Sequence, residues 1–342
     1  MDTTSMRQRK VTLADIAAKT GYGTNTVSLA LRGSTRISQA ARDLIRGVAD
    51  EMDYVPNKIA ASLVLNRSNT IGLILHEITN PVLTSVAHMV QKTLGKHGYS
   101  VLFASSNGDP EEELKAIAAF RARMVDGLLI YPIAHSKLDH LKALRRNNFP
   151  TVLLIHTDAT GIDAVGIDER KGAFDATNHL IERGHRRIGT LGPSFTSTVG
   201  NVGKLQGYRD ALEAAGIAYD PTIVSIPIDH SIEASVHAMD ELMAQDDAPS
   251  AIFATSDLTA LAALRWAAKS NVKVPEELAI VGFDDTDYVA QATTPISSIH
   301  NDVEQLATEA VERLLFLIAN KELLPPAETR TTPGRLIIRE SS

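Results

Sequence analysis

The chain of 342 residues contains no cysteine and no run of apolar residues long enough to cross a membrane. Without cysteine, disulfides, thiolate metal sites and cysteine catalysis are excluded, and a reducing compartment is compatible with the composition. A membrane span needs roughly eighteen consecutive apolar residues. The polar start MDTTSMRQRK also lacks the apolar core of a secretory signal. These absences predict a cytoplasmic protein that makes no membrane contact.

Sequence signatures of catalysis are also missing. Neither a G-x-G-x-x-G after an apolar strand nor a G-x-x-x-x-G-K-[ST] loop occurs. The segment GPSFT at 192–196 is not a nucleophile elbow, and DDTD at 284–287 lacks the rest of a calcium-binding loop. His179 and His185 lack the spacing of zinc ligands and are interpreted as a pair that packs on a sheet. No enzyme activity, cofactor or metal is predicted, and DDTD is interpreted as a solvated acidic turn in which only Asp284 faces a ligand.

Charge is distributed unevenly along the chain. Residues 1–66 hold 9 Lys/Arg and 6 Asp/Glu, whereas the remainder holds 25 Lys/Arg and 35 Asp/Glu. A mildly basic N-terminal part on an acidic body suits a head that binds a polyanion and a body that is kept away from it.

The first sixty residues contain only helical patterns. TLADIAAKTG starts with Thr12 as its N-cap and has Asp15 three residues later, which is the spacing of a capping box. A Gly-Tyr-Gly turn at 21–23 ends this helix, and a second helix is expected from about Thr24 to Leu31. Ser38 caps a third helix, QAARDLIRGVADEMDY. Its apolar stripe is expected to pack on the other two helices and consists of Leu44, Ile45, Val48 and Met52.

Two short helices joined by a Gly-containing turn and followed by a third predict a helix-turn-helix, whose second helix enters the major groove of DNA. Val27 and Leu31, four residues apart, are expected to pack inward. The rest of this helix then faces DNA, where Asn pairs with adenine, Thr hydroxyls reach bases or phosphates, and an apolar side chain contacts a thymine methyl. The residues expected to face DNA are Thr24, Asn25, Ser28 and Leu29. The alternative is a small structural three-helix unit.

After Pro56, residues 57–69 are interpreted as a linker that folds only against a partner, because so short a helix is marginal alone in water. From residue 70 apolar strands alternate with amphipathic helices. This alternation predicts two doubly wound parallel sheets covered on both faces, with ligands at the C-terminal ends of the strands. The expected strands are 71–76, 100–105, 127–132, 151–156, 188–192, 251–255 and 278–283.

Segments along the whole chain resemble the LacI/GalR family of bacterial transcriptional repressors. They are VTLADIAAKTGYGTNTVSLALRGSTRIS, MDYVPNKIAASL, RMVDGLLIYP, GIDERKGAFDATNHLIERGHRRIG, GYRDALEAAGI, AIFATSDLTALAAL and LAIVGFDDTDYVAQATTPISSI. The resemblance implies an all-α helix-turn-helix head (1–56), a hinge helix (57–69) and an α/β core (70–342) like that of periplasmic sugar-binding proteins. The core then has two doubly wound parallel-sheet lobes, one formed by about 70–164 and 297–326, the other by about 165–296 and 327–342.

The resemblance also assigns contacts with DNA. Leu29 stands where arginine or histidine is common, so an apolar contact is expected there. Gly23 stands where a capping serine is common, which removes one phosphate donor. The implied roles are base reading by Thr24, Asn25 and Leu29, phosphate contacts by Thr26, Ser28 and Ser38, and hinge contacts by Asn57, Ala60 and Leu63. The small Ala60 lets two hinge helices approach, and Leu63 wedges into the minor groove.

Between the lobes the family binds a small effector, most often a sugar or a sugar phosphate. Asp284, at the end of LAIVGFD, is expected to accept two hydroxyls. Ser256 and Asn301 match polar positions that contact the ligand. Asp257 follows AIFATS and either contacts the ligand or serves as the N-cap of the next helix.

Three candidate effector-binding positions depart from the family pattern. Lys204 stands where an arginine usually holds the effector, so the charge is kept and the bidentate geometry is lost. It either pairs with a phosphate or carboxylate of the effector or is a solvated surface lysine. His230 stands near a usual stacking aromatic, and His156 belongs to an Ile-His pair that replaces a frequent Asp-Arg pair.

The sequence thus predicts a homodimeric repressor of a catabolic operon, bound to a pseudopalindromic double-stranded DNA operator. Its effector is expected to be a small carbohydrate or sugar phosphate, with an inducer favoured over a corepressor. The alternative is a sugar-binding carrier or sensor without DNA function, which the head and the polar N-terminus argue against.

Overall fold

The computed structural model describes residues 11–55, 67–134, 137–157, 159–192, 202–228 and 231–342. The chain divides into two compact units, Met1–Ser68 and Asn69–Ser342, which we call the head and the core. The predicted hinge residues Asn57, Ala60 and Leu63 lie outside the described residues, and so does the predicted pocket residue His230.

In its described residues 11–55, the head forms three short helices. Asp15 accepts a hydrogen bond from the backbone N–H of Thr12 at 2.8 Å, as predicted for a capping box. Gly21 follows the first helix with a φ of 75°, a left-handed conformation that glycine adopts without strain. Ser38 accepts a hydrogen bond from the backbone N–H of Ala41 and caps the third helix. The helices are α1 (Leu13–Thr20), α2 (Thr24–Leu31) and α3 (Gln39–Glu51).

A small apolar core holds these helices together. Ile16, Val27 and Ile45, one from each helix, are fully buried in it. The prediction for α3 is wrong at Leu44, which is 51% exposed. Neighbouring residues of a helix point about 100° apart, so Leu44 lies outside the buried face that contains Ile45 and Ala49.

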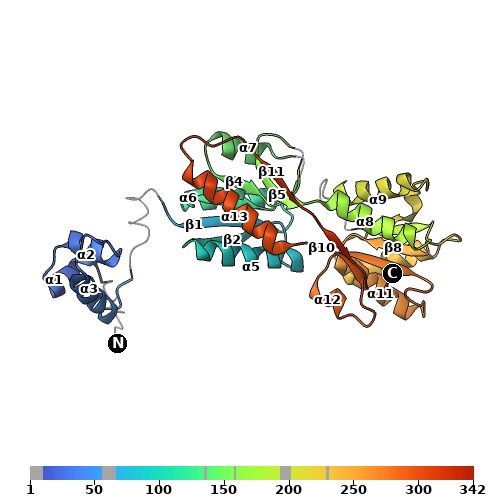
Figure 1. Cartoon of the computed structure of the whole chain (residues 1–342), viewed down its shortest axis with the longest axis horizontal. Coiled ribbons are helices and arrows are strands. Elements are labelled where there is room, and N and C mark those ends of the chain that lie inside the picture. Colours follow the sequence, from blue (N-terminus) through green and yellow to red (C-terminus); the bar gives the residue numbers. More distant parts are fainter. Residues whose placement is uncertain (1–10, 56–66, 135–136, 158, 193–201, 229–230) are drawn as a thin grey trace, which may run out of the picture. The chain divides into compact units, whose positions relative to one another are not determined.

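The core contains two lobes, each built on a six-stranded sheet (Figure 1). The sheet of the first lobe has the order β11-β5-β4-β3-β1-β2, and all its neighbouring strands are parallel. Its strands are β1 (Thr70–Leu75), β2 (Ser100–Ser105), β3 (Gly127–Ile130), β4 (Thr151–Leu153), β5 (Asp163–Ile167) and β11 (Thr329–Thr332). Its helices are α5 (Pro81–Lys96), α6 (Pro110–Ala122), α7 (Asp139–Arg146) and α13 (Val303–Ala319).

The second lobe has the strand order β12-β10-β9-β8-β6-β7, and β12 runs antiparallel to β10. Its strands are β6 (Ile188–Leu191), β7 (Val224–Ser225), β8 (Ala251–Ala254), β9 (Ala279–Asp284), β10 (Ser297–His300) and β12 (Arg335–Ile337). Its helices are α8 (Glu169–Glu182), α9 (Val202–Ala214), α10 (Ile232–Met243), α11 (Asp257–Lys269), α12 (Asp287–Ala290) and the 3₁₀ turn η1 (Pro221–Ile223).

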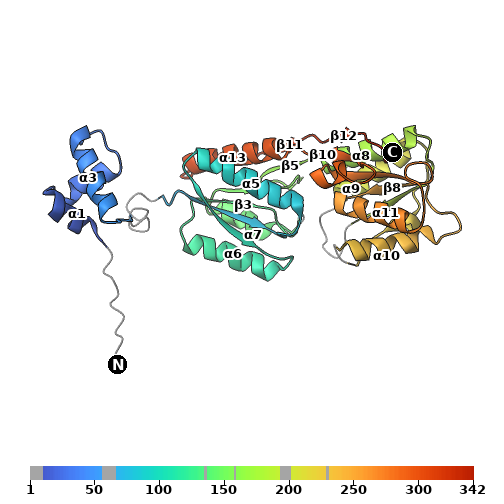
Figure 2. The ribbon, with the colours of Figure 1, turned by 90° about the horizontal axis from the view of Figure 1, so that it is seen from below.

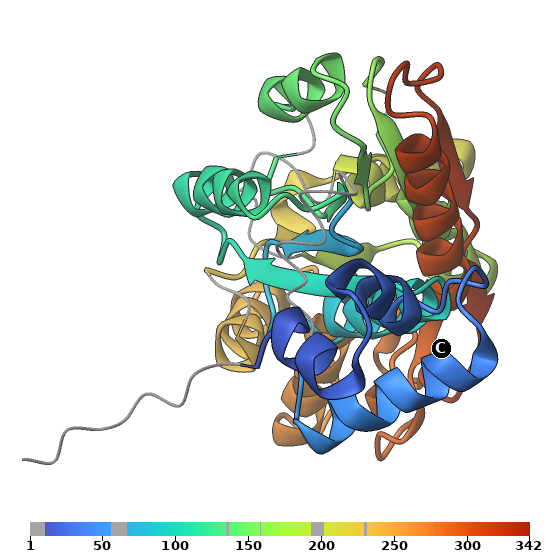
Figure 3. The same ribbon diagram turned by 90° about the vertical axis from the view of Figure 1, so that its left-hand side faces the viewer.

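Helices cover both faces of each sheet, as the apolar strands predict. In the first lobe α5 and α13 pack on one face and α6 and α7 on the other (Figures 2 and 3). In the second lobe α8 and α9 lie on one face, and α10 and α11 lie on the other (Figure 2). Within the ranges that the structure describes, no helix is both long and apolar enough to span a membrane.

The chain passes between the lobes at three places, each later than the sequence predicts. The predicted crossovers lie near 164, 297 and 326, whereas the first sheet keeps β5 up to Ile167, the second keeps β10 up to His300, and the first keeps β11 up to Thr332. The crossovers are therefore residue 168, residues 301–302 and residues 333–334. Each strand completes its pairing before the chain leaves the sheet, and β5, β10 and β11 are short strands that the apolar pattern did not reveal.

Candidate functional sites

A cavity of about 1130 Å³ lies between the two lobes of the core. Its walls include the C-terminal ends of parallel strands from both sheets, which is where doubly wound folds bind ligands. His76 follows β1, Tyr131 follows β3, Thr255 follows β8, Asp284 ends β9, and Asn301 follows β10. The cavity is large enough for a small organic ligand.

Asp284 lies in this wall with an unusual backbone conformation. Its φ is 115°, and that of the next residue, Asp285, is 55°. Positive φ costs a residue with a side chain about 1–3 kcal/mol and persists where the surroundings enforce it, often at functional sites. Its carboxylate accepts a hydrogen bond from Nδ2 of Asn301 at 3.2 Å. Asp284 and Asn301, predicted from distant segments, are thus neighbours in the cavity wall.

Asp257 holds the turn that carries Asp284. Its carboxylate is 2% exposed and accepts hydrogen bonds from the backbone N–H of Thr286 at 2.6 Å, the hydroxyl of Thr286 at 2.9 Å and the hydroxyl of Ser298 at 2.6 Å. A Cβ at Gly282 would lie 2.7 Å from Oδ1 of Asp257, so glycine is needed for this approach. Asp257 therefore positions the 284–286 turn from across the sheet.

The alternative that Asp257 is an N-cap is wrong. Ser256 is the N-cap of α11, and its hydroxyl accepts a hydrogen bond from the backbone N–H of Thr259. Asp257 occupies the first helical position and sends its side chain toward the 284–286 turn instead. Ser256 and Asp257 both contribute to the cavity wall, as predicted.

The interpretation of DDTD as a solvated acidic turn is also wrong. Asp285 forms ion pairs with Arg339 at 2.6 Å and with His300 at 2.9 Å, and its side chain is 11% exposed. Thr286 lies in the cavity wall together with Asp284. Charged partners from β10 and the C-terminal segment explain why this acidic turn is held in the fold, and no local pattern in the sequence indicates them.

Lys204 on α9 is buried, so it is not the solvated surface lysine of the alternative interpretation. Its ammonium group donates to the backbone carbonyl of Thr255 at 2.9 Å, lies 3.7 Å from the carboxylate of Glu169, and is 4.0 Å from the ring centre of Phe283. Lys204, Glu169 and Phe283 all line the cavity. The lysine is therefore already held by three groups of the second lobe.

Burial raises the pKa of several carboxyl groups in this wall. For Asp284 burial is the main cause, Lys204 opposes it, Asp257 and Glu169 add to it, and the pKa reaches about 8. Burial raises the pKa of Asp257 to about 6, against the hydrogen bonds from Ser298 and Thr286. Burial also raises the pKa of Glu169, against the charge of Lys204. Perturbed carboxyl groups in a cleft are typical of functional sites.

Within the part of the chain that the structure describes, two buried polar atoms of the wall have no hydrogen-bond partner. They are Oδ1 of Asn301, whose residue is 4% exposed, and Oγ1 of Thr255, whose residue is 3% exposed. An unsatisfied buried polar atom costs about 1–3 kcal/mol, and native structures rarely leave one without a reason. Both residues belong to the cavity lining, which makes a bound ligand a candidate partner for these atoms.

The first lobe contributes a different wall. Glu113 on α6 is buried, and its two carboxylate oxygens accept hydrogen bonds from the ring of His140 at 2.7 Å and from the backbone N–H of Ile133 at 2.9 Å. The rings of His76 and Tyr131 are 4.9 Å apart, and Leu154 adds an apolar surface beside them.

Of the other predicted effector contacts, His156 lies outside the residues that line the cavity. It is exposed, and its Nδ1 is 3.1 Å from the hydroxyl of Thr331 on β11. Conversely, Glu169, Thr255, Thr286 and Glu113 line the cavity although the sequence did not single them out. Thr255 directly precedes the predicted Ser256 and Thr286 lies two residues after Asp284, so extending each predicted site by two residues would have found them.

The head presents α2 as its candidate DNA-binding helix. Val27 is buried and Leu31 is partly buried, as predicted, whereas Thr24 and Asn25 at the start of the helix are exposed. Leu29 is partly exposed. The side-chain placement thus leaves the N-terminal part of α2 available for a partner, which is the part that reads bases in helix-turn-helix proteins.

The predicted phosphate contacts have additional local roles. The hydroxyl of Ser28 accepts a hydrogen bond from Arg32 at 2.8 Å, which brings a guanidinium group to the same part of α2. The hydroxyl of Ser38 caps α3, and Thr26 is partly exposed on α2.

In the described part of the chain no three His, Asp or Glu side chains are placed to hold a metal ion.

Comparison with protein families gives two matches. Residues 12–57 match the family described as bacterial regulatory proteins, lacI family, and residues 177–342 match the periplasmic binding protein-like domain. The first match covers α1, α2 and α3, and the second covers most of the second lobe and the C-terminal elements of the first.

Curated proteins similar to this chain are bacterial regulators. The chain is 34% identical to the HTH-type transcriptional regulator CelR of Thermobifida fusca, over 98% of this chain and 99% of that protein. It is 31% identical to the HTH-type transcriptional repressor CytR of Escherichia coli (strain K12), over 98% of this chain and 97% of that protein.

Solved structures show the same architecture. A complex of the transcriptional regulator CelR with cellobiose matches with a TM-score of 0.72 and 31% identity, over 97% of this chain and 100% of that chain. The lac repressor dimer bound to operator and the anti-inducer ONPF matches with a TM-score of 0.87, over 97% of this chain and 99% of that chain. At 24% identity, this second likeness shows the fold.

Proposed function

Because the chain belongs to the lacI family of bacterial regulatory proteins, we propose that it represses transcription and that a small polar effector in the core cavity controls its binding to DNA. The chain is a DNA-binding transcriptional regulator, as its relatives are. We propose repression as its effect on transcription, together with the class of effector and the residues that contact it or DNA. The observation that carries it is the cavity between the lobes, in whose described lining Asn301 and Thr255 each keep one buried polar atom without a partner.

For the head, we propose that Thr24, Asn25 and Leu29 read bases and that Thr26, Ser28 and Ser38 contact phosphates. Exposure of Thr24 and Asn25 at the start of α2 supports this assignment. Asn57, Ala60 and Leu63 remain predicted hinge contacts. Selection of DNA from a random library tests the proposal, since a repressor of this kind enriches one pseudopalindrome.

The substitution Leu29→Arg tests base reading at one position. Arginine favours guanine, whereas an apolar side chain suits a thymine methyl, so the variant is expected to select half-sites that differ from wild type at one base. Asp50→Asn, at an exposed position of α3, is the matched control and should select the wild-type sequence. Identical half-sites for Leu29→Arg would contradict the assignment, and no enriched sequence for wild type would favour a carrier without DNA function.

For the core, we propose that Asp284, Asn301 and Ser256 face the effector, that Asp257 positions Asp284, and that Lys204 lies in the same wall, held by Thr255 and Glu169. A carbohydrate suits a wall that combines hydrogen-bonding groups with apolar surfaces such as Leu154 and Tyr131. The related regulator CelR has been solved with cellobiose, which makes cellobiose the first compound to test. Release of DNA on addition of the effector would identify it as an inducer.

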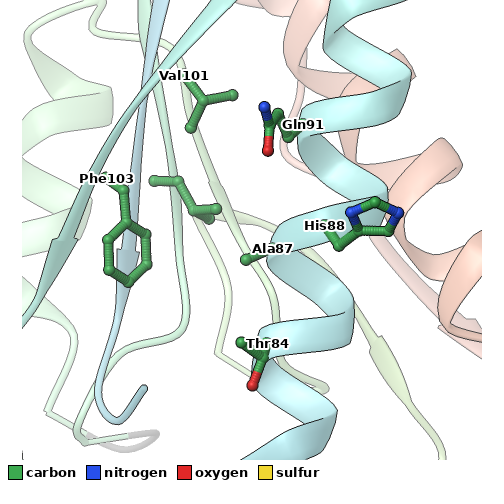
Figure 4. A pocket seen from close by; sticks show the side chains of 7 residues that line it. Thr84, Ala87, His88, Gln91, Val101 and Phe103 are labelled. Atoms are coloured by element: carbon green, nitrogen blue, oxygen red, sulfur yellow. The ribbon is translucent and has the colours of Figure 1, made fainter. Parts of the chain in front are cut away.

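We also propose that the protein acts as a homodimer, as the lac repressor does on its operator. The edge strand β2 and helix α5 supply an available surface in the first lobe. Between them lies a groove of about 260 Å³, in which Val101 and Phe103 face Thr84 and Ala87 (Figure 4). Phe103 is 39% exposed. Sedimentation of wild type and Phe103→Asp tests this surface, because a charge in an apolar interface should shift the protein toward the monomer.

A regulator of transcription works where the DNA is, so we propose a cytoplasmic location and no catalytic role. A mobility-shift assay with the selected pseudopalindrome, with and without cellobiose, tests the regulatory role directly. An enzyme or a carrier would leave the DNA fragment unshifted at physiological salt.

A further inference from the structure

The chemistry of the core cavity indicates which effectors can bind. We propose that the effector is uncharged and rich in hydroxyl donors, and that the site rejects ligands carrying phosphate or carboxylate groups. This inference rests on the proposed function in one respect, namely that a small ligand binds between the lobes. It narrows the expected class from sugars and sugar phosphates to unphosphorylated sugars and similar polyols.

Polar groups that lack a full set of hydrogen bonds lie on the second-lobe side of the cavity. Oδ1 of Asn301 and Oγ1 of Thr255 have no partner, and both residues are more than nine-tenths buried. Beside them, the carboxylate of Asp284 is bonded to Asn301 by one long hydrogen bond of 3.2 Å. The amide oxygen of Asn301 only accepts hydrogen bonds, whereas the hydroxyl of Thr255 and the carboxyl of Asp284, whose pKa is raised, accept or donate, so a hydrogen-bond donor on the ligand suits all three groups. Hydroxyl groups supply such donors, whereas an ionised phosphate or carboxylate brings further acceptors.

The lysine of this wall is already engaged. Lys204 donates to the carbonyl of Thr255 at 2.9 Å and lies close to the carboxylate of Glu169 and the ring of Phe283. An anion could take the lysine only by displacing the carbonyl and competing with Glu169. The prediction that Lys204 binds a phosphate on the effector therefore has a structural obstacle, and a role in holding the second-lobe wall together is the better assignment.

The charged side chains that line the cavity also disfavour an anionic ligand. In the described part of the chain its lining holds the acidic side chains of Glu77, Glu113, Glu169, Asp257 and Asp284. The lysines in the same lining are Lys204 and Lys137, and Lys137 is exposed at the surface, where water screens its charge. The raised pKa of Asp284 leaves this group largely protonated near neutral pH, but a phosphate brought into this wall would still meet more acidic than basic side chains, and the repulsion is strong where water is excluded.

Matched pairs of ligands test the inference. Thermal-shift assays and calorimetry would compare glucose, cellobiose, ribose and lactose with glucose 6-phosphate, cellobiose 6-phosphate, ribose 5-phosphate and lactose 6-phosphate. We expect at least one neutral sugar to bind and its phosphate to bind at least 100-fold more weakly. A phosphorylated sugar that binds wild type as tightly as its neutral partner overturns the inference and leaves the proposed function intact.

The variant Glu169→Gln sharpens the test because it removes the negative charge nearest to Lys204. We expect the affinity for the phosphorylated partner to rise at least 10-fold, while Glu182→Gln, at an exposed position of the same helix α8, changes nothing. If Glu169→Gln does not fold, Lys204→Met replaces it and is expected to retain preference for the neutral sugar. Loss of all sugar binding in Lys204→Met together with phosphate binding by wild type overturns the inference. No binding by any of the eight compounds counts against the proposed function and, with it, against this inference.

Discussion

The walls that the two lobes contribute to the cavity differ in how their polar side chains are hydrogen-bonded. On the first-lobe side, both carboxylate oxygens of Glu113 are bonded, one to His140 and the other to the backbone of Ile133. On the second-lobe side, Thr255 and Asn301 keep buried atoms without partners, and burial raises the pKa of Asp284. The difference favours effector contacts with Asn301, Thr255 and Asp284, and a structural role for Glu113 in the first lobe.

The largest expected effect is on effector affinity in Asp284→Ala. Removing the carboxylate leaves ligand hydroxyls without acceptors, which costs about 1–3 kcal/mol, or more where charge is involved. That is a loss of about ten to over a hundred in affinity. Calorimetric titration of the effector, such as cellobiose if the screen confirms it, measures this loss.

Operator binding without effector should be retained in Asp284→Ala, which would then repress permanently. Asp246→Asn, at an exposed position of the same lobe, is the control and should respond normally. Equal effector affinities in Asp284→Ala and wild type, with a lower melting temperature in the variant, would show that Asp284 has only a structural role.

The next effect concerns the first lobe. Glu113→Gln places an amide group where Ile133 N–H and His140 now meet a carboxylate, so one of these hydrogen bonds is lost or weakened. We expect the free energy of unfolding to fall by about 1–3 kcal/mol, with little change in effector affinity. Urea denaturation and calorimetry measure the two quantities. A loss of affinity as large as that of Asp284→Ala would break the comparison between the lobes.

A pH dependence of stability is expected from Asp284. Because its pKa is raised to about 8 in the folded protein, the folded state holds a proton that the unfolded state has lost above pH about 4. The contribution of this proton to the free energy of unfolding is therefore complete below pH about 4 and is lost as the pH rises toward 8. Glu169 and Asp257, which face Asp284, shift in the same sense, and Lys204 and Asn301 oppose the shift.

Urea denaturation of the apo protein at pH 5 and pH 8.5 measures this dependence. Asp284→Asn, which has no proton to lose, should flatten the profile and be more stable than wild type at pH 8.5. Asp246→Asn should keep the wild-type profile. A wild-type profile that is already flat between these pH values would argue against a strained, ionisable carboxylate in the wall.

The smallest effect tests the unpartnered hydroxyl of Thr255. Thr255→Val removes a buried hydroxyl without a partner, so the apo protein should be more stable by about 1 kcal/mol, while effector affinity falls. Thr177→Val is a close match, because Oγ1 of Thr177 is also buried without a partner but lies outside the cavity lining. It should raise stability and leave affinity unchanged. Equal affinity in both variants would remove Thr255 from the binding site.

Much of the fold follows from local patterns. Capping at Thr12 and Ser38, the Gly-Tyr-Gly turn and the long apolar strands were enough to predict the three-helix head and the two parallel sheets. Short strands were missed because their burial comes from neighbours rather than from their own pattern. β11, for example, has the sequence TRTT and is identified only by its pairing with β5. Leu44 shows the same limit in a helix. It is exposed although its neighbour Ile45 is buried, because adjacent residues of a helix point about 100° apart.

In the cavity wall, Asp284 was predicted at the end of an apolar strand, and Asn301 was predicted from the resemblance to the family. Glu113 could not be found this way, because it reaches His140 and Ile133 from a helix, 27 and 20 residues away in sequence. The contact between Asp257 and the 284–286 turn depends on the adjacent strands β8 and β9. Spacing along the chain identifies residue types and strand ends, but pairing across the sheets decides which of them meet.

Asn301 has a second location that matters for how a bound molecule could move the protein. It is the first residue of the crossover at 301–302, so a candidate ligand contact is also a joint between the lobes. The joint at 333–334 lies against it: a Cβ added at Gly334 would be 2.7 Å from Ile299 and 3.4 Å from Oδ1 of Asn301. A ligand that contacts the Asn301 amide would therefore touch one connection between the lobes and lie close to a second. Asn301 would then both bind the ligand and connect the two lobes.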